Sequence, residues 1–421
     1  MTENNMLKDL LSFISSSPSQ FHAVDSMKRM LSAAGFAELD ERKRYSLKRG
    51  GAYYVSRNSS SLIAFRIPEG GFSSYSVISA HTDSPTFRLK PNPEVSASGY
   101  TVLNAEGYGG MLISSWFDRP LSIAGRAFVL EDGSIKEHLV SFDRDLVMIP
   151  SLAIHQNREA NKGINYSIQK EVRPLIAEGE CSIDGLIAEC LGVERKSILS
   201  SDLFLVNRTA PSVWGACGEF FSSPRIDDLE CAYTAVRAII ESSSSDKLQI
   251  AALFDNEEVG SGTKQGALSD FLYQTIQRIM ISLSVDEEER MMIQSSSFML
   301  SADNGHAVHP NYPEKSDIVN HPRLNGGVLL KLSANQKYTT DGESYGFARF
   351  ILERNSIPYQ DFVNNSDVPG GSTLGNLSTQ KVSIRTADVG LAQLAMHSSY
   401  ESAGSRDIEH LYRFFRAFLE Y

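Results

Sequence analysis

The chain has 421 residues, of which 42% are hydrophobic and 22% charged, so it can bury a sizeable core and has room for more than one domain. Its formal net charge of -11 excludes a generally basic surface, and we expect no nucleic-acid partner. No stretch has the length and apolar character of a membrane span or a secretory signal, so we expect a cytoplasmic protein without membrane association.

The first part of the chain combines helical and strand patterns. Apolar residues recur at helical spacing over Met6–Ser15 and Phe21–Ala34. β-rich runs follow at Ala52–Ser56 and Ser61–Ile67, and Tyr75–Ala80 is predicted to be a buried strand. These segments predict the beginning of an α/β unit.

The middle of the chain has a different pattern. From residue 92 to residue 214 the periodicity is mixed and rich in turns, with clusters such as Tyr108-Gly109-Gly110. We therefore predict that residues 92–214 form a β-rich domain. It would be inserted into a discontinuous domain made of residues 1–91 and 215–421.

The last part of the chain returns to alternating elements. The expected helices are Asp228–Glu241, Ala267–Leu283, Tyr345–Arg354 and Asp407–Leu419. The expected strands are Leu248–Phe254, Ser297–Ala302, Gly327–Leu332 and Val382–Thr386. This alternation predicts an α/β fold in which helices flank the sheet.

Polar motifs directly follow the apolar strands, and functional groups of α/β sheets collect where strands end. His81-Thr82-Asp83-Ser84-Pro85 offers a histidine for a metal and an aspartate to orient it, although a plain strand-end turn explains the motif equally well. Arg225-Ile226-Asp227-Asp228 opens a helix, and helix capping is the better explanation of this motif taken alone.

The segment Asp255–Ser261 carries the strongest single signal. It follows a strand that is predicted to be fully buried, and it places Glu257 beside Glu258 ahead of a glycine that permits a tight turn. Two adjacent carboxylates in such a place repel each other unless a cation or a proton lies between them. A functional site is therefore favoured over a solvated acidic loop.

Two further motifs add histidines and a carboxylate. Ser301–Asn311 places Asp303 and His306 behind another apolar strand, and a polar surface loop is the less favoured explanation. His397 also follows an apolar run, and alone it is better explained as a core histidine. Together the five motifs supply the ligands that two borderline divalent ions need, with water or hydroxide between the ions.

Competing catalytic motifs are absent from the sequence. It has no His-Glu-x-x-His motif and no Gly-x-Ser-x-Gly elbow, and Gly260–Lys264 lacks the spacing of a phosphate-binding loop. The four cysteines form no CxxC pair, which favours reduced structural thiols over disulfides.

In their order, the motifs resemble the aspartyl aminopeptidase family of dinuclear zinc metallopeptidases, and the resemblance spans nearly the whole chain. It is carried by His-Thr-Asp-Ser-Pro, Arg-Ile-Asp-Asp-Leu, Asp-Asn-Glu-Glu-Val-Gly-Ser, Ser-Ala-Asp-x-x-His-Ala-x-His-Pro-Asn and Met-His-Ser. The resemblance implies a zinc-exopeptidase-like catalytic domain, a mixed sheet flanked by helices, with an inserted β-rich dimerisation domain. It also implies two divalent metal ions per subunit, with Zn2+ expected and Mn2+ or Co2+ as alternatives.

The resemblance assigns a role to each motif. The implied ligands are His81 and Asp303 for one metal, Glu258 and His397 for the other, and Asp227 as the bridge between them. Asp83 would orient His81, and Glu257 would be the general base when water attacks the peptide bond.

Substrate contacts and assembly follow from the same resemblance. The implied substrate-binding residues are His155, His306, Lys331 and Tyr338. His155 ends a loop in the insert that resembles the family's loop carrying a histidine into a neighbouring subunit's active site. Lys331 is a suitable counter-ion for a bound carboxylate, although without the family an exposed strand lysine and a partly buried tyrosine would explain Lys331 and Tyr338. The expected assembly is a large homo-oligomer, such as a tetrahedral dodecamer.

The sequence departs from the family pattern at three places. Met396–Glu401 lacks the arginine usual after its serine, Asp228 stands where asparagine is usual, and Gly370–Thr373 lacks a common cysteine. Every implied metal ligand is retained, so the departures bear on the pocket for the substrate's first side chain. The expected activity is removal of N-terminal residues, above all Asp or Glu, from peptides with a free N-terminus.

Two other functions compete with this interpretation. One is a non-catalytic scaffold or carrier of the same fold, stabilised by its metals, but the retained Glu257 and ligands argue against it. The other is a dinuclear hydrolase of N-acyl amino acids, because one metal core can serve several hydrolytic reactions. His155 and Lys331 favour the aminopeptidase.

Overall fold

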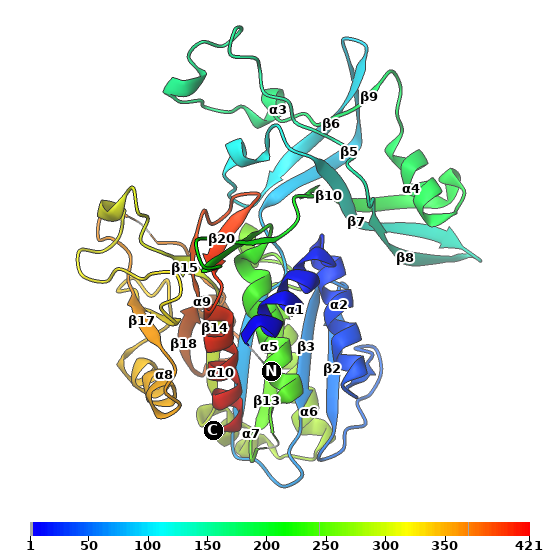
Figure 1. Ribbon diagram of the computed structural model, residues 1–421. Helices are drawn as coiled ribbons and strands as arrows, with labels where there is room; N and C mark the ends of the chain where they lie inside the picture. Colours follow the sequence, from blue (N-terminus) through cyan, green and yellow to red (C-terminus); the bar gives the residue numbers. More distant parts are fainter. Residues whose placement is uncertain (1–2, 244, 369) are drawn as a thin grey trace.

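The computed structural model describes residues 3–243, 245–368 and 370–421. Helices cover a large mixed sheet, and a second sheet from the middle of the chain stands above it (Figure 1). Within the described ranges, no helix combines the length and the apolar character needed to cross a bilayer.

The large sheet has nine strands in the order β1-β2-β3-β13-β4-β14-β18-β16-β17. These strands are β1 (Ala37–Leu39), β2 (Ala52–Arg57), β3 (Ser61–Arg66), β4 (Tyr75–His81), β13 (Leu248–Phe254), β14 (Phe298–Ala302), β16 (Val328–Lys331), β17 (Tyr359–Phe362) and β18 (Arg385–Gly390). The neighbours β13, β4, β14 and β18 are parallel to one another. Strands β4 and β13 are buried along their whole length, as expected where helices cover both faces.

Two helical layers bury the faces of this sheet. One core includes residues of α1 (Glu3–Ser15), α2 (Gln20–Ala33), α5 (Ile226–Glu241), α8 (Gly342–Arg354) and α10 (Asp407–Glu420). The other core includes residues of α6 (Phe271–Ser282) and α7 (Glu287–Ser295). In α10, Leu411, Phe414, Phe415 and Phe418 recur at helical spacing and are all buried, so the apolar stripe of the sequence is the face that packs.

The middle of the chain forms a six-stranded antiparallel sheet in the order β8-β7-β10-β5-β6-β9. Its strands are β5 (Thr86–Ala97), β6 (Tyr100–Tyr108), β7 (Leu121–Glu131), β8 (Ser134–Ser141), β9 (Leu175–Glu178) and β10 (Ile198–Asn207). The short helices α3 (Ile168–Glu171) and α4 (Ile183–Leu191) contact β6 and β8. This sheet has a core of its own, which includes Phe87, Trp116 and Leu203.

A third sheet lies between these two parts, with five short strands in the order β11-β12-β20-β19-β15 (Figure 1). They are β11 (Ser212–Trp214), β12 (Phe220–Ser223), β15 (Gly305–His306), β19 (Ala392–Leu394) and β20 (Glu401–Gly404). The four-residue helix α9 (Gly375–Ser378) precedes β18. The third sheet places the loop between β19 and β20 beside the ends of the central strands.

The predicted α/β class, with a mixed sheet flanked by helices, is confirmed. The strand predicted at Leu248–Phe254 has those bounds in the structure. The strand predicted at Val382–Thr386 is wrong in position, because β18 begins at Arg385 and Val382 packs in the core below it. Helix α6 begins at Phe271 rather than Ala267, because the residues before it form turns.

Candidate metal centre

The carboxyl ends of three neighbouring strands converge at one edge of the large sheet, since β13, β4 and β14 are adjacent and parallel. Strand β4 ends at His81, and Asp303 directly follows β14. After β13 the chain turns into the short 3-10 helix η4 (Glu257–Val259). The start of α5 adds Asp227.

Asp227 lies between two histidines. Its Oδ1 is 3.4 Å from His81 Nε2, and its Oδ2 is 3.4 Å from His397 Nε2. The Nε2 of His397 is also 3.5 Å from Glu258 Oε2. A carboxylate that turns one oxygen toward each of two imidazole nitrogens has the arrangement of a group that can bridge two cations.

The structure brings the five predicted ligands together. Ligand atoms of His81, Asp227 and Glu258 lie within 4.8 Å of one another, and His397 joins them through the contacts just described. A second group within the same limit contains Asp227, Asp303 and a neighbouring aspartate, Asp228, which was not among the predicted ligands.

Several carboxylate oxygens of this cluster have no hydrogen-bond partner. Asp227 Oδ1, Asp228 Oδ1 and Glu258 Oε1 are buried, and no described residue donates to them. Buried negative atoms without partners are costly, so they indicate a missing positive group. With the imidazole nitrogens they form the nitrogen and oxygen donor set that zinc, manganese and cobalt accept. The residues present therefore fit divalent metal ions.

In the absence of a cation, protons compensate the carboxylates. Burial opposes protonation of His397, but the hydrogen bond to Asp227 and the charge of Glu258 raise its pKa to about 10. Burial likewise opposes protonation of His81, yet Asp227 and other carboxylates raise its pKa well above the ordinary value. Burial raises the pKa of Glu258 and of Asp303. Bound metal would replace these protons.

Asp83 holds the turn that carries the two glutamates. Its Oδ1 accepts the backbone N–H of Glu257 at 3.1 Å, and its Oδ2 accepts that of Glu258 at 3.2 Å. The Nδ1 of His81 is 3.1 Å from the backbone oxygen of Asp83 and 3.4 Å from its Oδ1. Asp83 thus contacts both the histidine and the glutamate turn.

Three of the predicted substrate residues, Lys331, Tyr338 and His306, lie in different environments. Lys331 is buried, and its Nζ donates to the backbone oxygens of Asp303 at 2.9 Å and Asn304 at 3.0 Å. The ring of the buried Tyr338 has its centroid 5.0 Å from Lys331 Nζ. His306 is exposed on β15. Lys331 therefore ties a positive charge to the strand end that carries Asp303.

His155 is placed differently from the other predicted residues. It belongs to the mostly exposed segment 151–164, which precedes α3 (Figure 1). This segment is part of the middle of the chain that carries the six-stranded sheet, called the inserted part from here on. Among the described residues, neither group of possible metal ligands includes His155, and no hydrogen bond or ion pair links it to the cluster.

Glu401 is a buried carboxylate that sequence reasoning missed. Its Oε1 accepts the backbone N–H of His397 at 2.7 Å, and its Oε2 accepts that of Asp227 at 3.1 Å. It therefore fixes the backbone of two predicted ligands. The sequence offers one signal for Glu401, its position four residues after His397. Tyr108 and Gly110, which the sequence showed only as a turn cluster, also contact residues of the centre. Tyr108 binds Asp83, and the backbone oxygen of Gly110 contacts His397.

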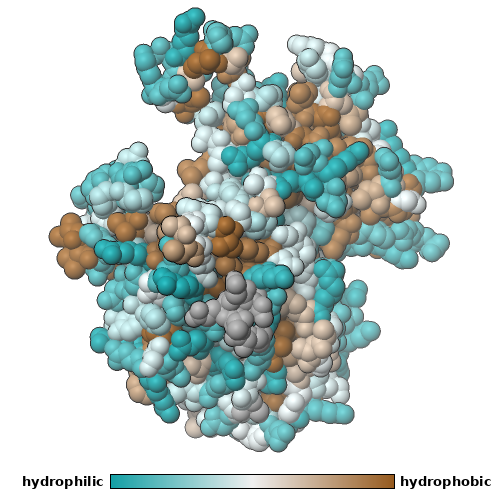
Figure 2. Space-filling model, viewed as in Figure 1, coloured by the Kyte–Doolittle hydropathy of each residue, from teal (hydrophilic) through white to brown (hydrophobic). Residues whose placement is uncertain are grey.

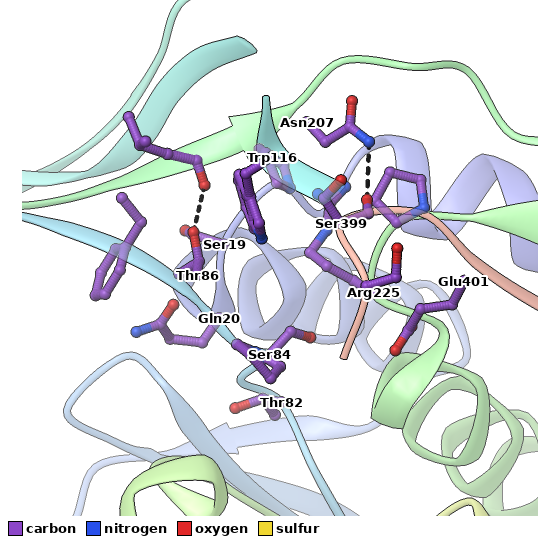
Figure 3. Close-up of a pocket in the computed structure, with 16 residues that line it drawn as sticks. Ser19, Gln20, Thr82, Ser84, Thr86, Trp116, Asn207, Arg225, Ser399 and Glu401 are labelled. Atoms are coloured by element: carbon purple, nitrogen blue, oxygen red, sulfur yellow. Dashed lines mark hydrogen bonds between the residues drawn. The ribbon is translucent and has the colours of Figure 1, made fainter. Parts of the chain in front are cut away.

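A small cavity lies where α2, the inserted part and the loop before β20 meet (Figure 3). Its volume of ≈ 30 Å³ leaves room for roughly one or two water molecules. Trp116 and Arg225 line it, and Nε1 of Trp116 and Nε of Arg225 are buried without a partner among the described residues. A cavity of this size has room for water but not for a peptide.

Comparisons of sequence relate the whole chain to known peptidases. Residues 13–419 match the model of a family described as aminopeptidase I zinc metalloprotease (M18). A probable M18 family aminopeptidase 2 from Clostridium acetobutylicum is 42% identical over 421 residues, covering 97% of each protein. One of the same description from Ectopseudomonas mendocina is 39% identical over 426 residues, covering 98% of this chain and 97% of its own.

Solved structures share the fold over the full length. A cryo-EM structure of the Ape4 and Nbr1 complex matches with a TM-score of 0.95 and 34% identity, covering 100% of this chain and 86% of that one. The mApe1 dodecamer of S. cerevisiae matches with a TM-score of 0.88 and 27% identity, covering 100% and 98%. The likeness therefore includes both the large sheet and the inserted part.

Proposed function

The chain belongs to the aminopeptidase I zinc metalloprotease family (M18) and is a metalloaminopeptidase. We propose that it removes N-terminal residues, above all Asp or Glu, at a two-metal centre. The observation that carries this proposal is the position of Asp227, which turns one oxygen toward each of two histidines at 3.4 Å.

The proposed ligands divide into two sets around the bridging Asp227. His81 and Asp303 would hold one ion, and Glu258 and His397 the other, with Zn2+ as the expected metal and Mn2+ or Co2+ as alternatives. The unpartnered oxygens of Asp227 and Glu258 support a ligand role for these two residues. When bound, the ions supply Lewis acidity that polarises the peptide carbonyl and makes water easier to deprotonate.

Glu257 is the proposed general base. It takes a proton from the attacking water and returns it to the nitrogen of the departing amine. Burial raises its pKa to about 8 in the metal-free protein, and nearby positive charge lowers the pKa of a carboxyl group. Asp83 supports this role, because its Oδ1 accepts the backbone N–H of Glu257 at 3.1 Å.

His155, His306, Lys331 and Tyr338 are the proposed substrate-binding residues. Lys331 provides the positive charge that suits an acidic first side chain, and its Nζ is 3.8 Å from Asp303 Oδ2. Because Lys331 is buried, the substrate's carboxylate would have to displace one of the backbone carbonyls bound to Lys331, or contact Tyr338 instead of Lys331. His155 would come from another subunit.

We also propose a cytoplasmic homo-oligomer, with a dodecamer as one form, in which residues 92–214 serve as the oligomerisation domain. Its cysteines are unpaired, as the cytoplasm favours. Figure 2 shows apolar residues among hydrophilic ones over the inserted part and at the left edge of the molecule. Ile135 of β8 is 65% exposed, and Ile318 is 89% exposed. Exposed apolar side chains that gather into a patch are typical of surfaces that another subunit covers.

One substrate comparison tests the proposed function. The zinc-, manganese- and cobalt-loaded protein would be given an unblocked Asp-peptide, the matched Leu-peptide and the N-acylated Asp-peptide. We expect fastest cleavage of the unblocked Asp-peptide. Preference for the N-acylated substrate would favour the N-acyl amino acid hydrolase, and no hydrolysis with any metal would favour a scaffold or carrier.

A further inference from the structure

The segment Tyr108–Leu112 leaves the inserted sheet and crosses onto the ligand cluster. It begins with Tyr108, the last residue of β6, and leads into the 3-10 helix η1 (Ile113–Trp116). Contacts along this segment reach both sides of the centre, the glutamate turn and His397.

Tyr108 reaches the carboxylate that holds the glutamate turn. Its hydroxyl donates to Asp83 Oδ2 at 2.8 Å and accepts from Asn256 Nδ2 at 2.8 Å. Its ring packs edge-on against Phe204 of β10, with the centroids 5.4 Å apart. The ring is therefore anchored in the inserted sheet, while its hydroxyl fixes a carboxylate that also accepts the N–H groups of the two adjacent glutamates.

His397 is held by the same segment. Its Nδ1 lies 2.6 Å from the backbone oxygen of Gly110, and its own backbone oxygen accepts the N–H of Leu112 at 2.9 Å. A carbonyl can only accept, so Nδ1 carries the hydrogen in this contact. Once the ring loses its second proton, its Nε2 lone pair lies on the side of Asp227 and Glu258 and is free for a cation.

Gly109 lies against the other predicted ligand of that ion. A side-chain carbon added at Gly109 would be 3.0 Å from the Cβ of Glu258 and 3.2 Å from its backbone oxygen. The segment therefore fits closely over Glu258.

We propose that the Tyr108–Leu112 segment positions the metal centre, with Tyr108 as a positioning residue that acts through Asp83. This inference rests on the proposed ligand roles of His397 and Glu258. It gives the inserted part a second task besides assembly, because the geometry of the centre in each subunit depends on that subunit's own insert. Groups that hydrogen-bond to metal ligands and orient them contribute strongly to metal affinity and to activity.

The test compares Tyr108→Phe with Tyr100→Phe. Both tyrosines lie on β6, but Tyr100 is 49% exposed at the other end of the strand. Tyr108→Phe removes only the hydroxyl and keeps the ring against Phe204. Zinc affinity would be measured by competition with a chelating dye, kcat and KM with the unblocked Asp-peptide, and stability as the midpoint of thermal unfolding of the metal-free protein.

We expect Tyr108→Phe to lower zinc affinity or kcat about 10- to 100-fold while KM stays near the wild-type value, and Tyr100→Phe to change none of these. Wild-type zinc affinity together with wild-type kcat in Tyr108→Phe would overturn the inference. So would a loss that the two variants share. Because dye competition needs no turnover, it still tests the segment if the proposed substrate proves wrong.

Discussion

Glu257 and Glu258 are sequence neighbours whose carboxyl groups have different surroundings. The Glu258 side chain is 4% exposed, lies 3.5 Å from His397 Nε2 and keeps one oxygen without a partner. No ligand group of three includes Glu257 among the described residues, although its backbone is held by the same Asp83. This difference supports separate roles, a ligand for Glu258 and a base for Glu257.

The variant Glu257→Gln tests the role of the base. We expect kcat to fall by about 10²- to 10⁴-fold, because an amide cannot accept the proton from water. Bound zinc, measured by elemental analysis, should stay at the wild-type amount. Glu288→Gln, on an exposed turn of α7, is the control and should remain active. Near-normal hydrolysis by Glu257→Gln would contradict the assignment.

At the scale of elements, a second prediction concerns Gly109 in the turn after β6. Gly109 and Gly133 both have a φ of 75°, so alanine at either position costs about 1 kcal/mol or more in backbone strain. Only at Gly109 would the new carbon meet Glu258, since nothing lies within 4 Å at Gly133. We expect Gly109→Ala to weaken zinc binding, measured by dye competition, by at least tenfold.

The matched variant Gly133→Ala separates strain from contact. It should lose a similar amount of stability in urea unfolding and keep the zinc affinity of the wild type. Equal zinc affinity in the two variants would show that the fit of Gly109 over Glu258 is not needed.

The strand ends were predictable from sequence because burial and parallel pairing leave a strong local pattern. Ile250–Phe254 is a continuous apolar run, and it forms most of β13, whose bounds Leu248–Phe254 agree with the prediction. The same pattern singled out His81 and Asp303, which the structure brings together with Asp227. The contact between Tyr108 and Asp83 was not predictable, because it joins the end of β6 to the turn after β4 and no periodicity encodes it.

At the scale of the whole molecule, the buried ionisable groups of the centre predict how stability depends on pH and metal. Burial raises the pKa of Glu257 and of Glu401 from 4.5 to about 8. The pKa of His397 rises from 6.5 to about 10. The metal-free fold therefore binds more protons than the unfolded chain between about pH 4.5 and pH 10, and its free energy of unfolding falls as pH rises through that window.

Metal removal should therefore cost more stability at high pH. Bound ions replace the protons, so the free energy of unfolding of the loaded protein falls less as pH rises. Free zinc at a thousandfold excess over its Kd adds about 4 kcal/mol to that free energy. We expect the gap in thermal midpoint between zinc-loaded and chelator-treated protein to be wider at pH 8 than at pH 6. An equal gap at the two pH values would argue that the cluster does not bind the metal.

The last prediction concerns the assembly. His155 lies on an exposed segment, and among the described residues no hydrogen bond or ion pair links it to the ligand cluster of its own chain. If His155 completes a neighbour's site, His155→Ala should lower kcat/KM strongly while zinc content and fold are unchanged. A mixture of His155→Ala and Glu257→Gln subunits, dissociated and reassembled together, should then regain activity. In such a pair the His155→Ala subunit keeps its own base and receives an intact His155 from its partner. Each variant reassembled alone should stay inactive. If His155 serves its own subunit instead, no mixed pair contains a complete site, and the mixture should be no more active than the two variants measured separately.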